Sequence, residues 1–312
     1  MDKDARIGVV GATGAVGNVT LDLLRERGYT NVRAFASSRS AGKQLDAITV
    51  EEATPDTLAA ADVDVFLFSV GTSASRELVP HALRSGAVCI DKSAAFRLAD
   101  GVPLVVPEVN AGRALEHEGI VANPNCSTIP LACVLKPLHD AAGLRRVRVA
   151  TYQSASGAGA QRMEALRTMA PAEGNLAFDW PFDGEEYEDE AKMRAETRKI
   201  LELPELPFSA TCVRVPVLIG HSEAVWIETQ ERLEAEHARE LLGRAPSIRL
   251  VDVPTPRDAA GTDEVFVGRI RPDRSADNGI VLFLACDNLR KGAALNAIQI
   301  TELILARDRV AA

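Results

Sequence analysis

The chain of 312 residues lacks an apolar run of the roughly 20 residues needed to cross a bilayer. Its start, MDKDARIGVVG, lacks the layout of a signal peptide and leads straight into a strand-like run. A basic excess is also missing, because the net charge is -9. Nucleic acids and anionic membranes require a basic surface, so neither is expected as a partner. We therefore expect a cytoplasmic protein.

Cysteine is sparse, and its pattern excludes two kinds of site. The five cysteines form no CxxC pair, have no neighbouring histidines and are odd in number, so neither a disulfide framework nor a zinc site is predicted, and we expect no metal. Four lie in apolar segments, where a small buried hydrophobe is the usual role: Cys89, Cys133, Cys212 and Cys286. Cys126 differs because it stands in the polar stretch NPNCST.

Hydrophobic residues make up 46% of the chain, which is enough for two packed domains. Residues 1–125 alternate short apolar runs with helical patterns, which predicts an α/β, Rossmann-like domain with a parallel sheet. The expected strands are 5–11, 32–37, 63–69, 87–91, 103–107 and 119–123, and the expected helices are 15–28 and 73–86.

Residues 126–292 have longer strands at hairpin-like spacing and predict a second, α+β domain with a mixed, mostly antiparallel sheet. The expected strands are 145–155, 209–218, 222–233, 263–273 and 279–288. Helices at 161–170 and 189–203 are expected to shelter one face of this sheet. Apolar residues at helical spacing predict that 293–312 form a helix that packs back on the first domain.

A glycine-rich turn, GATGAVG, follows the first expected strand and opens a helix. Such a turn lets the backbone approach a pyrophosphate, whose charge the helix N-terminus favours. A tight strand-to-helix turn without a ligand is the alternative. The predicted cofactor contacts here are Gly11, Thr13, Gly14, Ala15 and Val16.

The end of the second strand indicates which dinucleotide binds. An acidic residue at this position would favour NAD, but the segment ASSRSAGK offers hydroxyls and a guanidinium that suit the 2′-phosphate of NADP. We predict contacts from Ser37, Arg39 and Ser40, with a solvated polar loop as the alternative. A small-residue turn after the third unit, with Gly71 and Ser73, suits adenosine contact.

Cys126 directly precedes an apolar helical pattern. A helix N-terminus stabilises a thiolate, which is the reactive form, and its N–H groups can stabilise an oxyanion. The alternative is a buried filler, but the polar flanks and the position at the domain boundary favour a nucleophile.

Several motifs together carry a resemblance over nearly the whole chain: GATGAVG, NPNCST, TYQSASGAG, RVPVLIGH and DNLRKGAALN. With them, the sequence resembles the bacterial type of aspartate-semialdehyde dehydrogenase. The resemblance implies NADP-dependent, reversible conversion of aspartate semialdehyde and phosphate to aspartyl phosphate, in lysine, methionine and threonine biosynthesis. It also implies a homodimer formed through the second domain.

The resemblance assigns roles to residues of this sequence. It implies that Cys126 is the nucleophile, His221 the general base, and Gln153 the residue that orients the substrate. The implied substrate-binding residues are Arg214 for the carboxylate, Arg97 and Lys192 for the phosphate, and Asp189 and Asn125. The implied further cofactor contacts are Ser156, Gly157 and Asn288.

Two departures and one geometric conflict accompany these roles. Lys92 stands where relatives usually have asparagine, and Asp189 stands where they usually have glutamate. Arg214 and His221 are seven residues apart, which would put them on opposite faces of one regular strand. Pro216 and Gly220 would have to break that strand.

Two other functions remain open. An N-acetylglutamyl-phosphate reductase uses related chemistry, but its cysteine generally lies in a GCYPT context, whereas this chain has NCST. A non-catalytic NADP-binding homologue is the alternative from another class. Joint retention of Cys126, Gln153, Arg214 and His221 argues against it.

Overall fold

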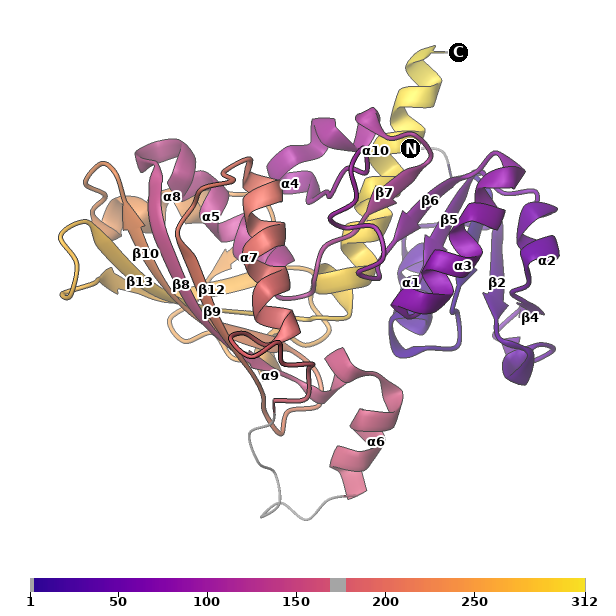
Figure 1. The fold of residues 1–312 in the computed structure, drawn as a ribbon, viewed down its shortest axis with the longest axis horizontal. Helices are drawn as coiled ribbons and strands as arrows, with labels where there is room; N and C mark the ends of the chain where they lie inside the picture. The colour runs from indigo at the N-terminus through magenta and orange to yellow at the C-terminus, as the bar shows by residue number, and fades with distance from the viewer. Residues whose placement is uncertain (1–2, 169–177, 312) are drawn as a thin grey trace. The chain divides into compact units, whose positions relative to one another are not determined.

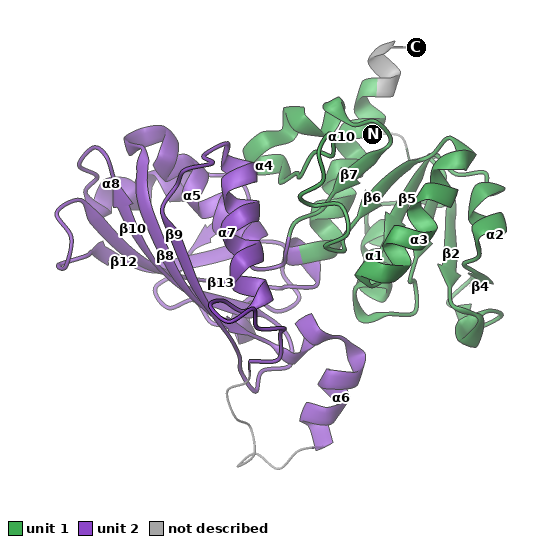
Figure 2. Ribbon diagram, in the orientation of Figure 1, with its two compact units in different colours: residues 1–124, 293–312 green, residues 125–292 purple. Residues whose placement is uncertain are grey.

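The computed structural model describes residues 3–168 and 178–311. Met169 and Ala170, the end of one expected helix, lie outside this range. The chain divides into two compact units (Figure 2). Unit 1 comprises residues 1–124 and 293–312, and unit 2 comprises residues 125–292.

Unit 1 is built on a mainly parallel sheet that has, among the described residues, the order β3-β4-β2-β1-β5-β6-β7 (Figure 1). The strands are β1 (Ile7–Val10), β2 (Val32–Ala36), β3 (Gln44–Leu45), β4 (Ile48–Glu52), β5 (Val65–Phe68), β6 (Val88–Asp91) and β7 (Ile120–Ala122). The helices are α1 (Ala15–Glu26), α2 (Pro55–Ala59), α3 (Thr72–Ala82), α4 (Pro107–Asn110) and α10 (Leu295–Ala311). Only the β3–β4 pair is antiparallel in this set.

The central strands of this sheet are apolar at successive positions, so apolar side chains lie on both faces and both faces need to be covered. On β5, Val65 and Leu67 pack in a cluster with residues of α1 and α10. Phe66 and Phe68 point the other way and pack in a cluster with residues of α2 and α3. The α/β prediction for this part of the chain is confirmed.

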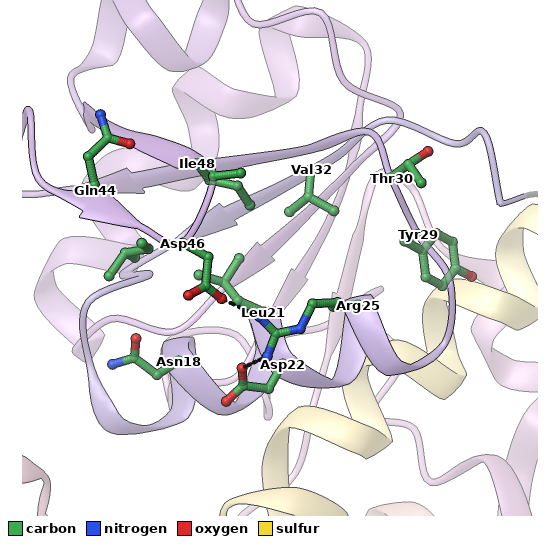
Figure 3. Close-up of a pocket in the computed structure, with 12 residues that line it drawn as sticks. Asn18, Leu21, Asp22, Arg25, Tyr29, Thr30, Val32, Gln44, Asp46 and Ile48 are labelled. Atoms are coloured by element: carbon green, nitrogen blue, oxygen red, sulfur yellow. Dashed lines mark hydrogen bonds and ion pairs between the residues drawn. The ribbon is translucent and has the colours of Figure 1, made fainter.

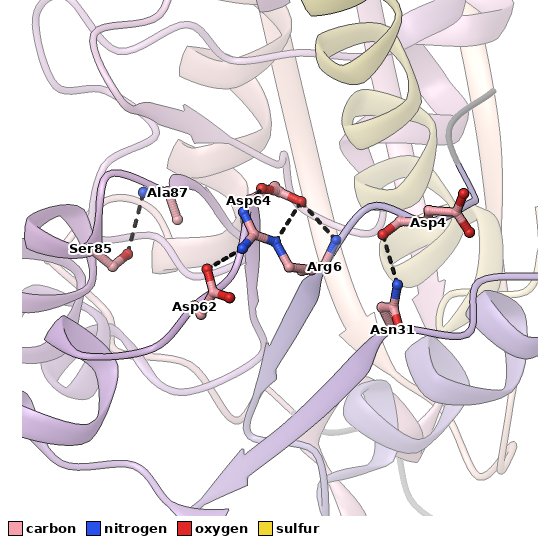
Figure 4. A network of polar contacts seen from close by, with 7 residues as sticks. All are labelled: Asp4, Arg6, Asn31, Asp62, Asp64, Ser85 and Ala87. Atoms are coloured by element: carbon pink, nitrogen blue, oxygen red, sulfur yellow. Dashed lines mark hydrogen bonds and ion pairs between the residues drawn. The ribbon is translucent and has the colours of Figure 1, made fainter.

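Charged side chains tie the beginning of β1 to the beginning of β5 (Figure 4). The backbone N–H of Arg6 donates to the Asp64 carboxylate at 2.8 Å, and the Arg6 guanidinium pairs with both Asp62 and Asp64. These groups are largely exposed to solvent, so we expect the pairs to contribute little to stability.

Unit 2 contains a mixed sheet with the order β11-β12-β13-β10-β8-β9 in the described residues. The strands are β8 (Leu144–Gln153), β9 (Phe208–Arg214), β10 (His221–Thr229), β11 (Ile248–Leu250), β12 (Val265–Pro272) and β13 (Gly279–Cys286). The helices are α5 (Thr128–Ala142), α6 (Ala160–Thr168), α7 (Glu188–Leu201), α8 (Ala235–Arg244) and α9 (Pro256–Ala259). The pairs β12–β13, β13–β10 and β10–β8 are antiparallel, which confirms the predicted mixed, mostly antiparallel sheet.

Helices α5, α7 and α8 pack against this sheet and against one another. The side chains that alternate with the helix-facing ones form an open face that includes Tyr152, Trp226 and Phe283. The rings of Tyr152 and Phe283 lie 6.1 Å apart, and Tyr152 is 38% exposed. Unit 2 therefore has one covered and one open sheet face.

Two expectations about the elements were wrong, and one hairpin was not predicted. Residues 103–107 form no strand: Leu104 makes one isolated bridge to Ala122, and α4 begins at Pro107. Two prolines, which lack an N–H, limit pairing there. The β3–β4 hairpin was not predicted, and α6 contacts the turn at Ala155–Ala158 and projects beyond the sheet instead of sheltering it (Figure 2). None of the helices in the described ranges has the length and apolar character of a membrane span.

Candidate active site

Arg214, Gln153 and His221 lie in one row across three neighbouring strands of unit 2. Gln153 of β8 pairs with Arg214 of β9. On the other side of β8, Tyr152 pairs with Ser222 of β10, which puts His221 beside Gln153. The expected conflict between Arg214 and His221 disappears because the residues belong to different strands. Between them Gly220 adopts φ +96°, where a side chain would collide with the Pro256 carbonyl.

Cys126 lies next to this row, just before α5. Its Sγ atom is 3.2 Å from Nε2 of His221. Asn125 accepts the backbone N–H of Ser127 with its side-chain oxygen at 2.8 Å, which fixes the chain at the start of the helix. Cys126 is partly exposed, whereas the other four cysteines are buried. The reactive thiol expected from the sequence therefore has both access and a nearby imidazole.

The His221 imidazole is fully buried, and burial followed by the charge of Arg214 lowers its pKa from 6.5 to about 3, while a bond to the Gly220 carbonyl acts in the opposite direction. The ring is therefore neutral at physiological pH. The backbone N–H of Ser154 donates to Nδ1 at 3.0 Å, which favours a proton on Nε2, facing the sulfur. Ser154 Oγ, 3.1 Å from Nδ1, can accept a hydrogen bond from the tautomer that has its proton on Nδ1.

Asp189 connects two of the predicted site residues. Its buried carboxylate accepts one hydrogen bond from Nδ2 of Asn125 at 2.8 Å and one from Nε2 of Gln153 at 2.6 Å. Glu196, also on α7, accepts the backbone N–H of Asn125 at 2.7 Å. Two carboxylates from one helix thus hold the segment that carries Cys126.

The Arg214 guanidinium is buried and has three neighbours. Its Nη1 donates to the Ser154 carbonyl at 2.7 Å, its Nε lies 2.9 Å and 3.0 Å from the two Asp179 carboxylate oxygens, and its Cζ lies 4.7 Å from the Trp180 ring centre. A Cβ added at Gly157 would lie 3.0 Å from Nε2 of His221 and 3.2 Å from Nη1 of Arg214. Both groups therefore lie close to Gly157, where there is little room for a side chain.

Asn288 organises the loops around His221. Its side-chain oxygen accepts hydrogen bonds from Ser154 Oγ, Ser156 Oγ and the backbone N–H of Gly220, at 3.0, 2.9 and 2.9 Å. Ser156 and Asn288, predicted as cofactor contacts, are thus brought together with Gly157 in unit 2.

The two residues predicted to bind phosphate lie in different units. Lys192 is on α7 and pairs with Glu188 at 2.8 Å. Arg97 belongs to unit 1, where its guanidinium donates to the carbonyls of Asn123 and Lys92 at 3.0 and 2.6 Å.

The glycine-rich turn of unit 1 leaves little room for side chains. Gly11 has φ +84°, and an added Cβ would lie 2.4 Å from the Ser69 carbonyl oxygen. Gly14 is the N-cap of α1 and offers no side-chain cap, so the first N–H groups of the helix are open to a ligand. Thr13 Oγ1 lies 3.4 Å from Ser40 Oγ, which joins this turn to the end of β2.

The remaining predicted cofactor residues also lie at carboxyl ends of unit 1 strands. Ser37 and Arg39 follow β2 and are exposed, and Gly71 and Ser73 begin α3 after β5. Lys92, the departure noted above, donates to Thr20 Oγ1 at 3.0 Å, and burial lowers its pKa to about 7. The lysine therefore contacts α1.

A cavity of about 470 Å³ lies beside α1 and the β3–β4 hairpin (Figure 3). Leu21, Val32 and Ile48 line it, and Arg25 of α1 pairs with Asp46 of the β3–β4 hairpin and with Asp22 of its own helix. None of the residues predicted to bind the dinucleotide lines this cavity.

Several residues of the site were not predicted from the sequence. Glu196 holds the backbone of Asn125, Ser154 contacts His221, and Asp179 pairs with Arg214. An added Cβ at Gly292 would lie 3.3 Å from Cβ of Cys126, and its motif, DNLRKGAALN, was the available signal. Glu223 is fully buried, and neither of its carboxylate oxygens has a hydrogen-bond partner among the described residues; burial, then the charge of Asp189, raises its pKa well above 4.5.

Two family models match the chain. Residues 6–117 match a semialdehyde dehydrogenase NAD binding domain, and residues 135–291 match a semialdehyde dehydrogenase dimerisation domain. The aspartate-semialdehyde dehydrogenase of Streptomyces akiyoshiensis is 45% identical, over 96% of this chain and 98% of its own. That of Bacillus subtilis is 41% identical, over 97% of this chain and 98% of its own.

Solved structures agree with the sequence matches. Aspartate semialdehyde dehydrogenase II of Vibrio cholerae, complexed with ASA, is 38% identical with a TM-score of 0.92, and the match covers 97% of this chain and 98% of that one. The enzyme of Candida albicans with NADP is 25% identical with a TM-score of 0.78, covering 98% and 99%.

Proposed function

This chain belongs to the aspartate-semialdehyde dehydrogenase family, and we propose on that premise that it interconverts L-aspartate 4-semialdehyde plus phosphate and L-4-aspartyl phosphate with NADP. This reaction serves lysine, methionine and threonine biosynthesis. The observation that carries the proposal is the 3.2 Å separation between Cys126 Sγ and His221 Nε2 at the start of α5.

Cys126 acts as the nucleophile. Its thiolate, favoured by the helix N-terminus, attacks the aldehyde carbon and forms a thiohemiacetal. Loss of the hydride leaves a thioester on the sulfur. Phosphate then attacks the thioester carbonyl, which releases aspartyl phosphate and restores the thiolate.

His221 handles the proton at Nε2. With the proton on Nε2, the neutral ring donates a hydrogen bond to the sulfur. When the sulfur adds to the aldehyde carbon, the ring donates this hydrogen bond to the aldehyde oxygen, which becomes negative. Ser154 Oγ allows the other tautomer, in which Nε2 is free to act as the general base. Gln153, held by Asp189, orients the substrate in the same row.

The residues of unit 1 fit NADP. Close backbone packing at Gly11 and the open N-terminus of α1 suit a pyrophosphate, with Thr13, Ala15 and Val16 beside it. Ser37, Arg39 and Ser40 suit the 2′-phosphate. Gly71 and Ser73 suit the adenosine, and Ser156, Gly157 and Asn288 contribute from unit 2. When bound, NADP accepts the hydride in the oxidative direction and NADPH supplies it in the reverse.

The substrate's anionic groups need fixed cations. Arg214 pairs with the substrate carboxylate, since its buried, stacked guanidinium suits a planar anion. The cations proposed for phosphate are Lys192 of unit 2 and Arg97 of unit 1, and Asp189 and Asn125 are further substrate-binding residues of unit 2.

The working form is a homodimer. The dimerisation-domain match covers unit 2, whose open sheet face presents Tyr152, Trp226 and Phe283. Such an apolar patch is typical of a protein interface. A cytoplasmic location agrees with five free cysteines, because thiols persist in reducing compartments.

A spectrophotometric assay tests this function. The enzyme should reduce NADP with aspartate semialdehyde only when phosphate is present, and N-acetylglutamate semialdehyde should be turned over at least about 100-fold less efficiently. Equal use of both aldehydes would favour the reductase alternative. Complete inactivity of correctly folded enzyme would favour the non-catalytic one.

A further inference from the structure

Arg214 already has a carboxylate partner within the protein. Both oxygens of Asp179 lie within 3.0 Å of its Nε, and the Arg214 side chain is only 5% exposed. The Asp179 side chain is 31% exposed, so solvent reaches the ion pair from the Asp179 side. A ligand arriving from solvent would therefore meet Asp179 at the guanidinium.

The two edges of this guanidinium have different partners. Nη1 is engaged by the Ser154 carbonyl, whereas Nε is engaged by Asp179. Arginine usually binds a carboxylate through two N–H groups along one edge. The edge that contains Nε is the one that an incoming carboxylate would use, and Asp179 presents the same chemical group there.

The segment that carries Asp179 is anchored independently of Arg214. The rings of Phe178 and Phe182 lie 5.2 Å and 5.0 Å from that of Tyr187, and the backbone N–H of Glu188 donates to the Pro181 carbonyl at 2.8 Å. The segment can therefore stay in place when the Asp179 side chain turns away. Trp180 and the Ser154 carbonyl would still hold the guanidinium plane.

We propose that Asp179 is a displaceable internal ligand of Arg214 that sets the affinity and selectivity of the site for carboxylate-bearing substrates. The identity of the substrate rests on the function proposed above. The substrate carboxylate replaces Asp179 on Arg214. The apparent affinity of the enzyme for the substrate is therefore lower than the intrinsic affinity, and it falls as the fraction of molecules with Asp179 on Arg214 rises. A ligand without a carboxylate does not compete for Arg214.

Kinetics of Asp179→Asn test the proposal. The amide keeps the size of the side chain but removes the competing charge, so KM for aspartate semialdehyde should fall about threefold to tenfold. The value of kcat should change less than twofold. Glu185→Gln is the matched control, because it removes one charge from the same exposed segment and Glu185 is not among the residues that contact Arg214 in the described part of the chain, and its KM should equal that of the wild type.

Protection of Cys126 from iodoacetamide gives a second measurement that needs no turnover. L-homoserine has the carbon skeleton and carboxylate of the substrate but no aldehyde, and 3-aminopropan-1-ol lacks the carboxylate. A ligand on Arg214 should shield the sulfur, because Arg214 and His221 both lie close to Gly157 and Nε2 of His221 is 3.2 Å from Sγ of Cys126. Asp179→Asn should lower the half-protecting concentration of L-homoserine about threefold to tenfold and leave that of 3-aminopropan-1-ol unchanged.

The outcomes separate the two proposals. An inactive wild type that L-homoserine still protects, more strongly in Asp179→Asn, would overturn the proposed reaction and support the Asp179 role. Normal turnover with a KM and half-protecting concentration that are unchanged or raised in Asp179→Asn would leave the reaction standing. It would show that Asp179 merely positions Arg214, and the inference would be wrong.

Discussion

The carboxylate of Asp189 accepts a 2.6 Å hydrogen bond from the amide of Gln153. Its second oxygen accepts the amide of Asn125, which is adjacent to Cys126. One side chain thus fixes Gln153 and the residue next to Cys126 together. A carboxylate suits this position because both of its oxygens are acceptors.

Asp189→Asn should therefore lower kcat about 10- to 100-fold, because an amide has only one acceptor and must leave Gln153 or Asn125 facing an N–H group. Steady-state rates at saturating substrate measure this. Asp189→Glu restores both acceptors and should retain much more activity than the amide variant. Wild-type kcat in Asp189→Asn would show that the bridge has no role in positioning.

Cys126 should be both essential and selectively reactive. Cys126→Ala should reduce phosphate-dependent NADP reduction at least about 10⁴-fold, because the covalent intermediate cannot form. Mass spectrometry after brief iodoacetamide treatment of native enzyme should find the label on Cys126 and not on the four buried cysteines. Cys133→Ala is the control and should remain active. Substantial labelling elsewhere, or activity in Cys126→Ala, would contradict the proposed nucleophile.

His221 should make stability depend on pH in an acidic window. Its pKa falls from 6.5 to about 3 on folding, so between these values the unfolded chain binds a proton that the folded chain does not. The free energy of unfolding should therefore decrease as pH falls from about 6.5 toward 3, by at most about 1.4 kcal/mol per pH unit, and be unaffected above this window.

Urea unfolding of the wild type and His221→Gln at several pH values measures this contribution as a difference. The variant should lack that part of the slope, while His237→Gln, at an exposed position, should behave as the wild type. Parallel pH curves for the wild type and His221→Gln would refute the buried, neutral imidazole.

Arg39 should set the preference for NADP. Arg39→Ala removes the cation expected to meet the 2′-phosphate, so KM for NADP should rise about 10- to 100-fold while that for NAD changes little. Initial rates with each dinucleotide give the ratio of the KM for NAD to the KM for NADP. Arg84→Ala is the control. It removes a cation that precedes β6, at the opposite ends of the parallel strands, and should not alter this ratio. An unchanged ratio in Arg39→Ala would exclude this role.

Local sequence patterns correctly predicted those helices and strands that are determined by residues close together in the sequence. The apolar run before Gly11 and the periodic pattern after it were enough for β1 and α1. Residues 103–107 were misread because an apolar run between two prolines resembles a strand, although proline limits the pairing it can make. The two-residue strand β3 was too short to give any periodic signal.

Contacts between residues that are far apart in the sequence could not be predicted from the sequence. Asp189 and Gln153 are 36 residues apart, and their pairing depends on where α7 packs on the sheet. The ion pair of Arg214 with Asp179 spans 35 residues and is invisible in either local motif. The sequence indicated a reactive Cys126, and the family resemblance implied His221 as its partner, but the 3.2 Å separation joins two residues that are 95 positions apart.

Helix α10 has a consequence for how the chain is made. Its residues Ile298, Ile300 and Ile304 belong to the same apolar cluster as β1 and β5, yet all of unit 2 precedes them in the sequence. A ribosome therefore releases unit 2, which contains Cys126, before unit 1 has its full core. During synthesis, one apolar face of the sheet in unit 1 stays exposed until α10 has been made. A chaperone would be most useful during this interval.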